Sequence, residues 1–573
     1  MSRRSPARPA FISAPAPAAA PAWLWGIGVT AIAALVYLPA LRNGFIWDDP
    51  LVLEQLRAIH GWRDLVFLPN AIPRYYFRPL IFLSFLLDRA VGGETPFAFH
   101  CSVVALHALN TALVWWLGVR LFAAPAAAAL ATLVFAVHPI HVESVAWIAG
   151  RSDVIATAFL LASAIMLTYM RLRWTAAAAV MAYFLALLSK EAALGGLLVL
   201  PLIDFVLAHR PRWRANAALL LVTVIYFLVR RVALGAAMTG IATTAPAETV
   251  IRNLLAAFGF YVSKLVLPIG LSAYVPEVPG GWILPALGVV ALSALAAIGA
   301  LACRHNERRL AFFVWWFVCT LAPALVVIVR MSAQAPLADR YLYLPSVGVC
   351  LLLTRLAAFS GRWRAPTWIV ITIVGGVLAV MTIARNRVWA DDLLFWQDIT
   401  AKAPTYALGH RELAQIYLRR DQIAEADAAL QRALHGKSDR DGRVMTLNNA
   451  ATLYLRQQRL DDAERALQEA LTLFPHAYLY YGLGRVAVSR AEQAQARGDG
   501  DEAMRQVSHA RDQLTQAVAL DPGNAKAHAL LGQVLYNLRD LPAARLHLQQ
   551  ALQLGASGSV ADSARQYLKM AGG

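Results

Sequence analysis

The sequence predicts an all-α protein in which a polytopic membrane domain of about eleven transmembrane helices precedes an α-solenoid of helix-hairpin repeats. Hydrophobic residues make up 59% of the 573 residues and charged residues 15%, a balance typical of polytopic membrane proteins. Long apolar runs alternate with short polar links up to about residue 386. From about residue 391 the chain becomes charged and rich in Ala, Leu and Gln, without a run of membrane-spanning length.

These changes in composition divide the chain into four segments. Residues 1–22 are basic and rich in Pro and Ala and lack the layout of a signal peptide, so we expect an uncleaved, disordered cytoplasmic tail. Residues 23–386 form the multispan membrane domain, with residues 42–96 as its first outer loop. Residues 387–405 are a connector, and residues 406–573 form the repeat domain.

The apolar runs give the candidate spans. They lie at 23–41, 97–121, 123–139, 152–170, 174–189, 191–208, 215–235, 281–303, 310–329, 341–358 and 366–384. Residues 251–270 are also long enough, but they contain Lys264 and Pro268, so we predict an interfacial or re-entrant helix there.

The basic links predict the topology. With the first span running outward, every link on the cytoplasmic side carries Arg, as the positive-inside rule requires. Much of the formal net charge of +17 lies in these links, so the charge sets topology and does not indicate nucleic-acid binding. The C-terminal repeats then lie on the outer side of the membrane.

From residue 406 the sequence repeats with a period near 34 residues, the length of a tetratricopeptide unit. The best copy carries its small and large residues at Ala451, Tyr454, Ala463, Leu467, Ala470 and Pro475. Copies recur at 414–433 and 532–551, and a copy at 484–522 is expanded by a polar insert near 491–505. Stacked units create a concave groove suited to peptides or protein segments. The alternative is a plain spacer or dimerisation surface.

The predicted topology brings four polar stretches to the outer face. The first outer loop carries Asp48, Asp49 and Arg78, and the other stretches carry His138, His141, Glu143, Arg151, Asp153, Lys190, Glu191, Asp339, Arg340 and Tyr341. Ionisable residues at span ends are costly to bury in lipid, so their clustering indicates a polar, wet cavity. A transport pathway would also use such residues, but charges on one side only favour a site that opens to one face.

Seven motifs follow one another along the chain. They are NGFIWDD (43–49), YFRPL (76–80), HALN (107–110), HPIHVES (138–144), SKE (189–191), DRYLYLPS (339–346) and RNRVWADD (385–392). Together with the repeats they resemble the TMTC-type family, the transmembrane and tetratricopeptide repeat-containing O-mannosyltransferases, and most of all its bacterial relatives.

The resemblance implies a GT-C glycosyltransferase fold and the transfer of a sugar from a polyprenyl phosphate to an acceptor on the outer face. In eukaryotic members the donor is dolichyl phosphate mannose and the acceptor is a protein hydroxyl. For a bacterial relative we expect an undecaprenyl-phosphate sugar, with protein, glycan or lipid as acceptor.

Such a transfer needs a carboxylate to draw the proton from the acceptor hydroxyl. By analogy with GT-C enzymes, one of Asp48 and Asp49 is the base, and the other orients it or helps bind a divalent metal such as Mg²⁺ or Mn²⁺. The alternative is that the pair only caps a helix at 50–59.

The departing lipid phosphate needs cations, for which Arg340, Lys190 and Arg78 are the candidates. The alternative for each is pairing with a sequence neighbour, as Lys190 could pair with Glu191 and Arg340 with Asp339. The remaining polar residues are predicted to support catalysis or bind substrate: His138, His141, Glu143, Arg151, Asp153, Glu191, Asp339 and Tyr341.

A metal shared by His138, His141 and Glu143 is an alternative interpretation of that cluster. We expect His100 and His107 to be packed core histidines.

We therefore predict a membrane glycosyltransferase whose partners are a polyprenyl-phosphate sugar donor, membrane lipid and a protein held in the repeat groove. The alternative function is a membrane-anchored scaffold that assembles an envelope complex without catalysis.

Overall fold

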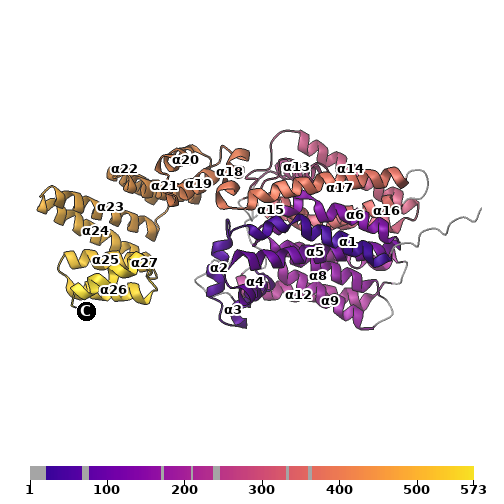
Figure 1. The fold of residues 1–573 in the computed structure, drawn as a ribbon, viewed down its shortest axis with the longest axis horizontal. Helices are drawn as coiled ribbons and strands as arrows, with labels where there is room; N and C mark the ends of the chain where they lie inside the picture. Colours follow the sequence, from indigo (N-terminus) through magenta and orange to yellow (C-terminus); the bar gives the residue numbers. More distant parts are fainter. Residues whose placement is uncertain are drawn as a thin grey trace, which may run out of the picture. The chain divides into compact units, whose positions relative to one another are not determined.

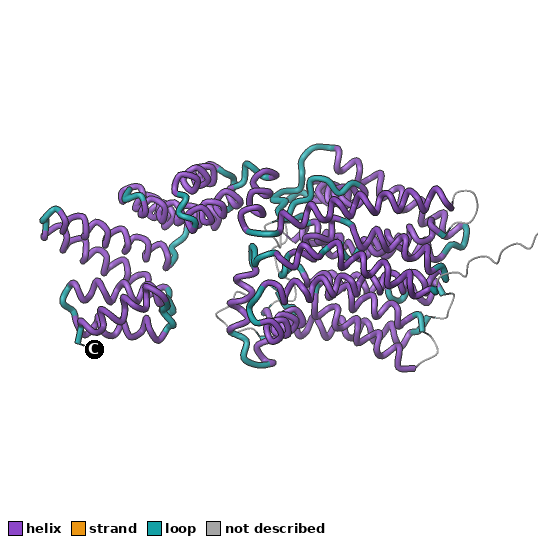
Figure 2. The backbone as a smooth tube through the Cα atoms, viewed as in Figure 1, coloured by secondary structure: helices purple, strands orange, loops and turns teal. Residues whose placement is uncertain are grey.

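The computed structural model describes residues 21–67, 76–169, 173–207, 211–235, 245–330, 335–358 and 364–572. These residues form helices joined by loops, and no strand runs through them (Figure 2). Of the predicted tail at residues 1–22, residues 1–20 lie outside the described residues, and Ala22 already begins the first helix. The chain divides into two compact units, Met1–Asp391 and Asp392–Gly573, and this boundary falls inside the segment predicted as a connector.

Seven helices in the described part of the membrane unit are long and apolar enough to cross a membrane. They are α1 (Ala22–Val36, continued to Arg42 by η1, Leu38–Arg42), α5 (Pro96–Phe122), α12 (Trp213–Leu234), α13 (Ala247–Val266), α14 (Ile283–Arg304), α15 (Arg308–Arg330) and α17 (Arg364–Asn386). Helix α6 (Pro125–Val137) and the segment Pro139–Ala146, bent by 51°, form an eighth if they count as one span. The chain is thus built as a multi-pass membrane protein.

The prediction of about eleven spans is not confirmed. Segment 191–208 is divided into η3 (Glu191–Gly195), α10 (Gly196–Val199) and α11 (Leu202–Val206). A Cβ at Gly195 would lie 2.5 Å from the Cys319 carbonyl oxygen, so this segment packs backbone to backbone against α15, and a proline at 201 interrupts it further.

Three other predicted spans are shorter than a bilayer-crossing helix. Helices α8 (Arg151–Leu167) and α9 (Arg173–Ser189) have 17 residues each. Segment 341–358 begins with the turn η4 (Asp339–Leu342) and continues as the 12-residue helix α16 (Ser346–Ala357).

The segment predicted to be interfacial is instead an unbroken 20-residue helix, α13, that qualifies as a span by length and composition. Its lysine lies in the last turn, where Lys264 Nζ donates to the carbonyl oxygens of Ile269 and Gly270 at 2.6 and 3.0 Å. Pro268 follows the helix end. Neither residue therefore breaks the apolar stretch.

The membrane unit is a bundle in which α1, α5, α8, α9 and α12 lie side by side (Figure 1). Helices α4 (Pro79–Gly92), α5 and α6 each begin at a proline, a residue whose missing N–H is tolerated in the first turn. We call the end of the bundle at which α1 ends and α4, α8 and α16 begin the polar end. The short elements there are α2 (Asp49–Arg57), α3 (Trp62–Val66), η2 (Pro139–His141), α7 (Val142–Ala146) and η5 (Arg387–Trp389).

The second unit confirms the predicted helical repeats. After α18 (Asp392–Lys402) it contains four hairpins and a final helix: α19 (Ala407–Arg419), α20 (Ile423–His435), α21 (Arg440–Arg456), α22 (Leu460–Leu473), α23 (Ala477–Ala496), α24 (Gly500–Leu520), α25 (Ala525–Asn537), α26 (Leu541–Gln553) and α27 (Gly558–Met570). The alanines and leucines at the predicted repeat positions, such as Ala463 and Leu467, are buried between helices.

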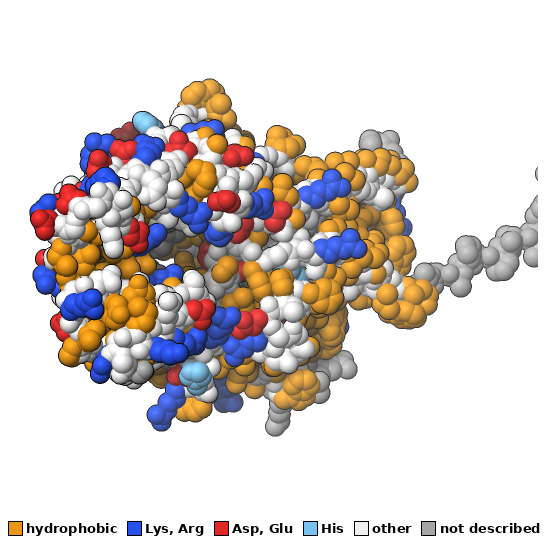
Figure 3. All heavy atoms as spheres, turned by 60° about the vertical axis from the view of Figure 1, so that its left-hand side comes forward, with side chains coloured by type: hydrophobic (Ala, Val, Ile, Leu, Met, Phe, Trp, Pro, Cys, Tyr) orange, Lys and Arg blue, Asp and Glu red, His pale blue; other side chains and the backbone are white. Residues whose placement is uncertain are grey.

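The polar insert near 491–505 forms no separate loop, because it lengthens the third hairpin to helices of 20 and 21 residues. Charged side chains of both signs cover the visible face of the repeat unit, whereas hydrophobic side chains cover much of the membrane unit (Figure 3).

Candidate functional site

The acidic pair lies in a constrained turn at the polar end. The Gly44 N–H donates to the Ala390 carbonyl at 3.0 Å, and Trp47 adopts a φ of 55°. Positive φ is rare for a bulky residue and persists only where the surroundings enforce it. Here the Trp47 ring stacks on Trp147 with centroids 4.7 Å apart, and Trp147 lies 6.3 Å from Trp389. This stack holds the residue that precedes the two acids.

Asp49 is fully engaged in structure. Its side chain is buried, Oδ2 accepts from the Ile46 N–H at 3.1 Å, and Oδ1 accepts from the Ala149 N–H at 3.0 Å. Burial raises the pKa of Asp49 to about 7, and the two backbone hydrogen bonds oppose that rise. Asp49 therefore ties its own turn to the loop that leads into α8.

Asp48 is the member of the pair whose carboxylate has no hydrogen-bond donor among the described residues. Its side chain is half-buried, makes no capping hydrogen bond to α2, and accepts no hydrogen bond from any other described residue. Burial raises the pKa of Asp48 to about 6, and the positive charge of Arg340 opposes that rise. The capping alternative is not supported, because neither carboxylate accepts a hydrogen bond from the N-terminal N–H groups of α2.

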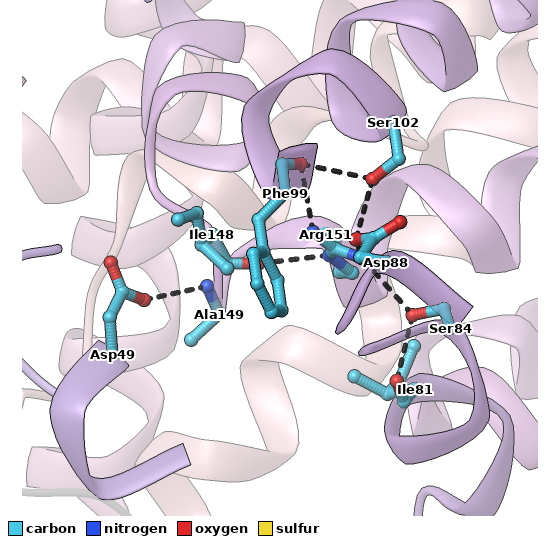
Figure 4. A network of polar contacts seen from close by, with 9 residues as sticks. All are labelled: Asp49, Ile81, Ser84, Asp88, Phe99, Ser102, Ile148, Ala149 and Arg151. Atoms are coloured by element: carbon cyan, nitrogen blue, oxygen red, sulfur yellow. Dashed lines mark hydrogen bonds and ion pairs between the residues drawn. The ribbon is translucent and has the colours of Figure 1, made fainter. Parts of the chain in front are cut away.

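A buried ion pair holds the loop behind Asp49 (Figure 4). Arg151 is inaccessible to solvent and pairs with Asp88 of α4. Its Nε donates to the Ile148 carbonyl at 3.3 Å and its Nη2 to the Phe99 carbonyl at 2.9 Å. Since Ala149 follows Ile148, the pair fixes the backbone that hydrogen-bonds Asp49. Arg151, predicted to support catalysis or bind substrate, is thus placed away from solvent, behind the turn that carries Asp49.

The Arg340 side chain pairs with Glu143 of α7, and its backbone N–H donates to Glu143 Oε2 at 2.9 Å. The guanidinium lies 5.5 Å from the Trp147 ring centroid and 5.2 Å from that of Tyr341. Arg340 thus lies against Trp147, one of the rings in the stack that positions the acidic turn. The predicted alternative of pairing with Asp339 does not occur, because Asp339 accepts from the Ser272 N–H at 2.9 Å.

Lys190 also pairs across the bundle. Its Nζ lies 2.5 Å from Asp153 Oδ2 and 5.4 Å from the Tyr341 ring centroid. Burial lowers the pKa of Lys190 to about 8 although Asp153 opposes the change. Its sequence neighbour Glu191 instead forms ion pairs with two arginines, with Arg78 at 2.9 Å and with Arg230 at 2.7 Å.

Burial alone would raise the pKa of Glu191, but these two arginines lower it to about 2. Arg78 in turn lies 4.3 Å from the ring centroid of Tyr76, which is 51% exposed. Tyr75, the residue before it, lies outside the described residues.

The histidines belong to the packing of the bundle. His138 Nε2 lies 3.0 Å from the Leu265 carbonyl, and His141 Nε2 lies 2.9 Å from Ser346 Oγ. His100 and His107 are fully buried, which confirms that they are core histidines. With Glu143 paired to Arg340, the three side chains of the alternative metal cluster take different partners.

No group of three or more His, Cys, Asp or Glu side chains converges to hold a metal ion within the described ranges. Both Asp49 oxygens accept backbone hydrogen bonds, so Asp48 is the one acid of the pair that is open to a ligand. These residues do not by themselves fit a divalent metal site, and no chemical step below passes through one.

Three residues of this region are absent from the site predicted from the sequence: Asp88, Arg230 and Trp147. Asp88 and Arg230 each interrupt an apolar helix, and an ionisable residue in such a run is a signal for function or pairing. Trp147 carried no signal, because its role depends on the stack with Trp47.

Comparison with known proteins agrees with this architecture. The tetratricopeptide repeat family model matches residues 448–509 and 496–559. A protein O-mannosyl-transferase of Caenorhabditis elegans is 25% identical over 412 residues, which cover 66% of this chain and 58% of that protein. Protein O-mannosyl-transferase Tmtc1 of Drosophila melanogaster is 33% identical over 190 residues, 31% of this chain and 22% of that protein.

Mouse protein O-mannosyl-transferase TMTC2 is 34% identical over 144 residues, which cover 23% of this chain and 17% of that protein. The match to each of these relatives spans less than two thirds of the relative's own length. The resemblance read from the motifs is confirmed: the chain is similar in sequence to the TMTC-type O-mannosyltransferases, and it carries both candidate membrane helices and tetratricopeptide repeats.

Proposed function

We propose that this relative of the TMTC-type protein O-mannosyl-transferases is a membrane glycosyltransferase of the GT-C type. It transfers a sugar, with mannose the first choice, from a polyprenyl phosphate to a protein hydroxyl. The observation that carries the proposal is the Asp48 carboxylate, which accepts no hydrogen bond from the described residues, beside a cluster of cations at one end of the bundle. The positive-inside rule puts that end on the periplasmic side.

In the proposed reaction Asp48 accepts the proton of the acceptor hydroxyl while the hydroxyl oxygen attacks the anomeric carbon of the sugar. The bond between that carbon and the phosphate oxygen breaks, and polyprenyl phosphate leaves with the bonding electrons. With a pKa of about 6, Asp48 is mostly ionised at neutral pH and can accept the proton. Asp49, with both oxygens occupied, keeps the turn in place and does not touch the substrate.

The cations stabilise the leaving phosphate. Arg78, Lys190, Arg230 and Arg340 lie in one cluster with Glu143, Asp153 and Glu191, and their guanidinium and ammonium groups can donate to the phosphate oxygens. Each cation is already held by an acid, which fixes its position before substrate arrives. A preorganised cluster of this kind loses little energy to rearrangement in the transition state.

The repeat unit has the architecture of a binding array. Stacked helical hairpins present a concave surface suited to peptides, and we assign it the recruitment of the protein acceptor. The scaffold alternative would use this unit alone and would not need an open acid beside four cations.

The test measures transfer of radiolabelled sugar from a panel of polyprenyl-phosphate sugars to periplasmic protein in membranes that contain the chain. Asp48→Asn should lower transfer by about 10²–10⁴-fold at unchanged expression, the usual contribution of a general base. Glu54→Gln, which alters an exposed acid on α2, is the matched control and should transfer normally.

Equal transfer by Asp48→Asn and the wild type would remove Asp48 from the mechanism. If the wild type transfers no sugar from any donor in the panel, the scaffold function is favoured.

A further inference from the structure

Three tryptophans from distant parts of the chain form one stack at the polar end. Trp47 belongs to the acidic turn, Trp147 follows α7, and Trp389 ends η5. The ring centroids of Trp47 and Trp147 lie 4.7 Å apart with planes at 20°, and those of Trp147 and Trp389 lie 6.3 Å apart with planes at 29°. Trp389 is inaccessible to solvent and Trp47 is half-buried, so the stack runs from the core to the turn.

The residue after Trp389 holds the other end of the same turn. The Gly44 N–H donates to the Ala390 carbonyl at 3.0 Å, and a Cβ at Gly44 would lie 3.8 Å from that oxygen. Element η5 also contacts η1, which leads into the turn. The turn at 44–49 is therefore held at its start by the hydrogen bond to Ala390 and near its end by Trp389, which acts through Trp147.

The turn needs this support because its backbone is strained. Trp47 has a φ of 55°, a value that a bulky residue keeps only where contacts enforce it. Asp48 follows directly, and its carboxylate accepts no hydrogen bond from the described residues, so its position depends on the backbone of the turn. Asp49 is held separately by the Ala149 N–H at 3.0 Å (Figure 4). Loss of the stack should displace Asp48, while the Asp49 contact keeps the turn attached to the bundle.

Trp389 also lies on the segment that joins the two units. The first unit ends at Asp391, and α18 begins at Asp392. The connector predicted at 387–405 therefore begins with residues that pack inside the first unit and support its acidic turn.

We propose that Trp389 is a positioning residue for sugar transfer, which fixes the ring of Trp47 through Trp147 and thereby places the carboxylate of the next residue. The assignment rests on the proposed function, because it takes Asp48 as the base. A general base must lie within hydrogen-bond reach of the hydroxyl that it deprotonates. A displaced Asp48 therefore slows the chemical step and leaves donor binding unchanged.

The first test compares three substitutions in the full-length chain. Trp389→Leu removes the ring, and Trp389→Phe keeps an aromatic ring in the stack. Phe312→Leu is the control, because it alters a buried ring of α15 beside Phe313, which contacts Phe122 at the end of α5. Trp389→Leu should lower kcat about 10–100-fold with an unchanged KM for the donor, the effect of misplacing a catalytic group by about 1 Å. Trp389→Phe should restore most of the rate, and Phe312→Leu should keep it.

The pH profile separates positioning from a loss of stability. Burial raises the pKa of Asp48 to about 6, and the neighbouring charges of Arg340 and Asp49 are the same in all variants. A displaced, more exposed Asp48 has a pKa closer to its ordinary value, so the acidic limb of kcat/KM should move to lower pH in Trp389→Leu. Phe312→Leu, which only weakens packing, should keep the limb in place.

A further measurement does not depend on catalysis. Hydrogen–deuterium exchange of the full-length chain in detergent follows the backbone N–H groups of residues 43–49, among them the Gly44 N–H. Trp389→Leu should speed their exchange roughly twofold to tenfold, as the loss of one aromatic pair predicts, and Phe312→Leu should not. Faster exchange supports the link between Trp389 and the turn even if the wild type transfers no sugar and the proposed function fails.

Two results would overturn the assignment. One is exchange in residues 43–49 that is as slow in Trp389→Leu as in the wild type. The other is faster exchange together with an unchanged kcat and an unchanged acidic limb, which would show that transfer does not depend on the position of this turn.

Discussion

At the scale of single residues, two neighbouring acids have different environments. The Asp49 carboxylate accepts backbone hydrogen bonds at both oxygens, from Ile46 and from Ala149, and the Asp48 carboxylate accepts none from the described residues. This separates the proposed base from the residue that positions it.

The pH dependence of transfer should follow the ionisation of the Asp48 carboxylate. A base must be ionised, and burial raises the pKa of Asp48 to about 6, so kcat/KM should fall as the pH drops through about 6. Arg340 opposes that rise, so Arg340→Gln should move the acidic limb to higher pH as well as lowering the rate. Profiles of kcat/KM against pH for both proteins provide the check. An acidic limb that stays in place in the variant would show that Arg340 does not act on the base.

The Asp88–Arg151 pair should be required for stability. Asp88→Asn leaves the buried Arg151 without its charge partner, which costs about 3–5 kcal/mol in comparable pairs. Thermal unfolding in detergent should show a large drop in midpoint for Asp88→Asn. Ser84→Ala removes only a 3.4 Å contact to the same guanidinium and should cost less than about 1 kcal/mol. Similar midpoints for the two variants would mean that the ion pair is not needed.

At the scale of elements, length and interruption decide what a segment becomes. The run at 191–208 is apolar enough for a span, yet it divides into η3, α10 and α11 because its backbone packs directly on α15 at Gly195. The run at 251–270 contains a lysine and a proline, yet it forms α13 because both fall in or after the last turn. Composition alone cannot distinguish these two outcomes.

Close packing within the repeat hairpins gives a prediction at this scale. A Cβ at Gly532 of α25 would lie 2.6 Å from Leu548 Cγ of α26, so Gly532→Val should overpack the hairpin and destabilise it by about 1–3 kcal/mol. Gly500→Ala, at the first residue of α24 where a Cβ meets nothing within 4 Å, is the control and should be neutral or slightly stabilising. Limited proteolysis of the full chain, read as the rate of cleavage within the repeats, measures both. Equal cleavage rates would contradict the packing argument.

At the scale of the whole molecule, the chain combines an apolar bundle with a charged array of hairpins as two compact units. All of the candidate catalytic residues lie in the first unit, and the tetratricopeptide matches lie in the second. In the proposed enzyme, chemistry and acceptor recruitment are therefore separable.

Truncation after Asp391 should separate them in experiment. The membrane unit alone should still transfer sugar to a short hydroxyl-bearing peptide at high concentration, and transfer to folded protein acceptors should fall. The measurement is the ratio of the two rates in the truncated and full chains. A truncated chain with an unchanged ratio would show that the repeats do not recruit the acceptor.

The sequence by itself determined the features that depend on local pattern. Apolar runs predicted the membrane bundle, the period near 34 predicted the hairpins, and the acidic pair was found just past the first span. The tertiary structure alone decided which charges pair. Arg340 takes Glu143, 197 residues away, and Lys190 takes Asp153, 37 residues away, in preference to acids beside them in sequence. The reason is geometric: side chains of adjacent residues at an element terminus diverge, and the packing of distant helices brings the actual partners together.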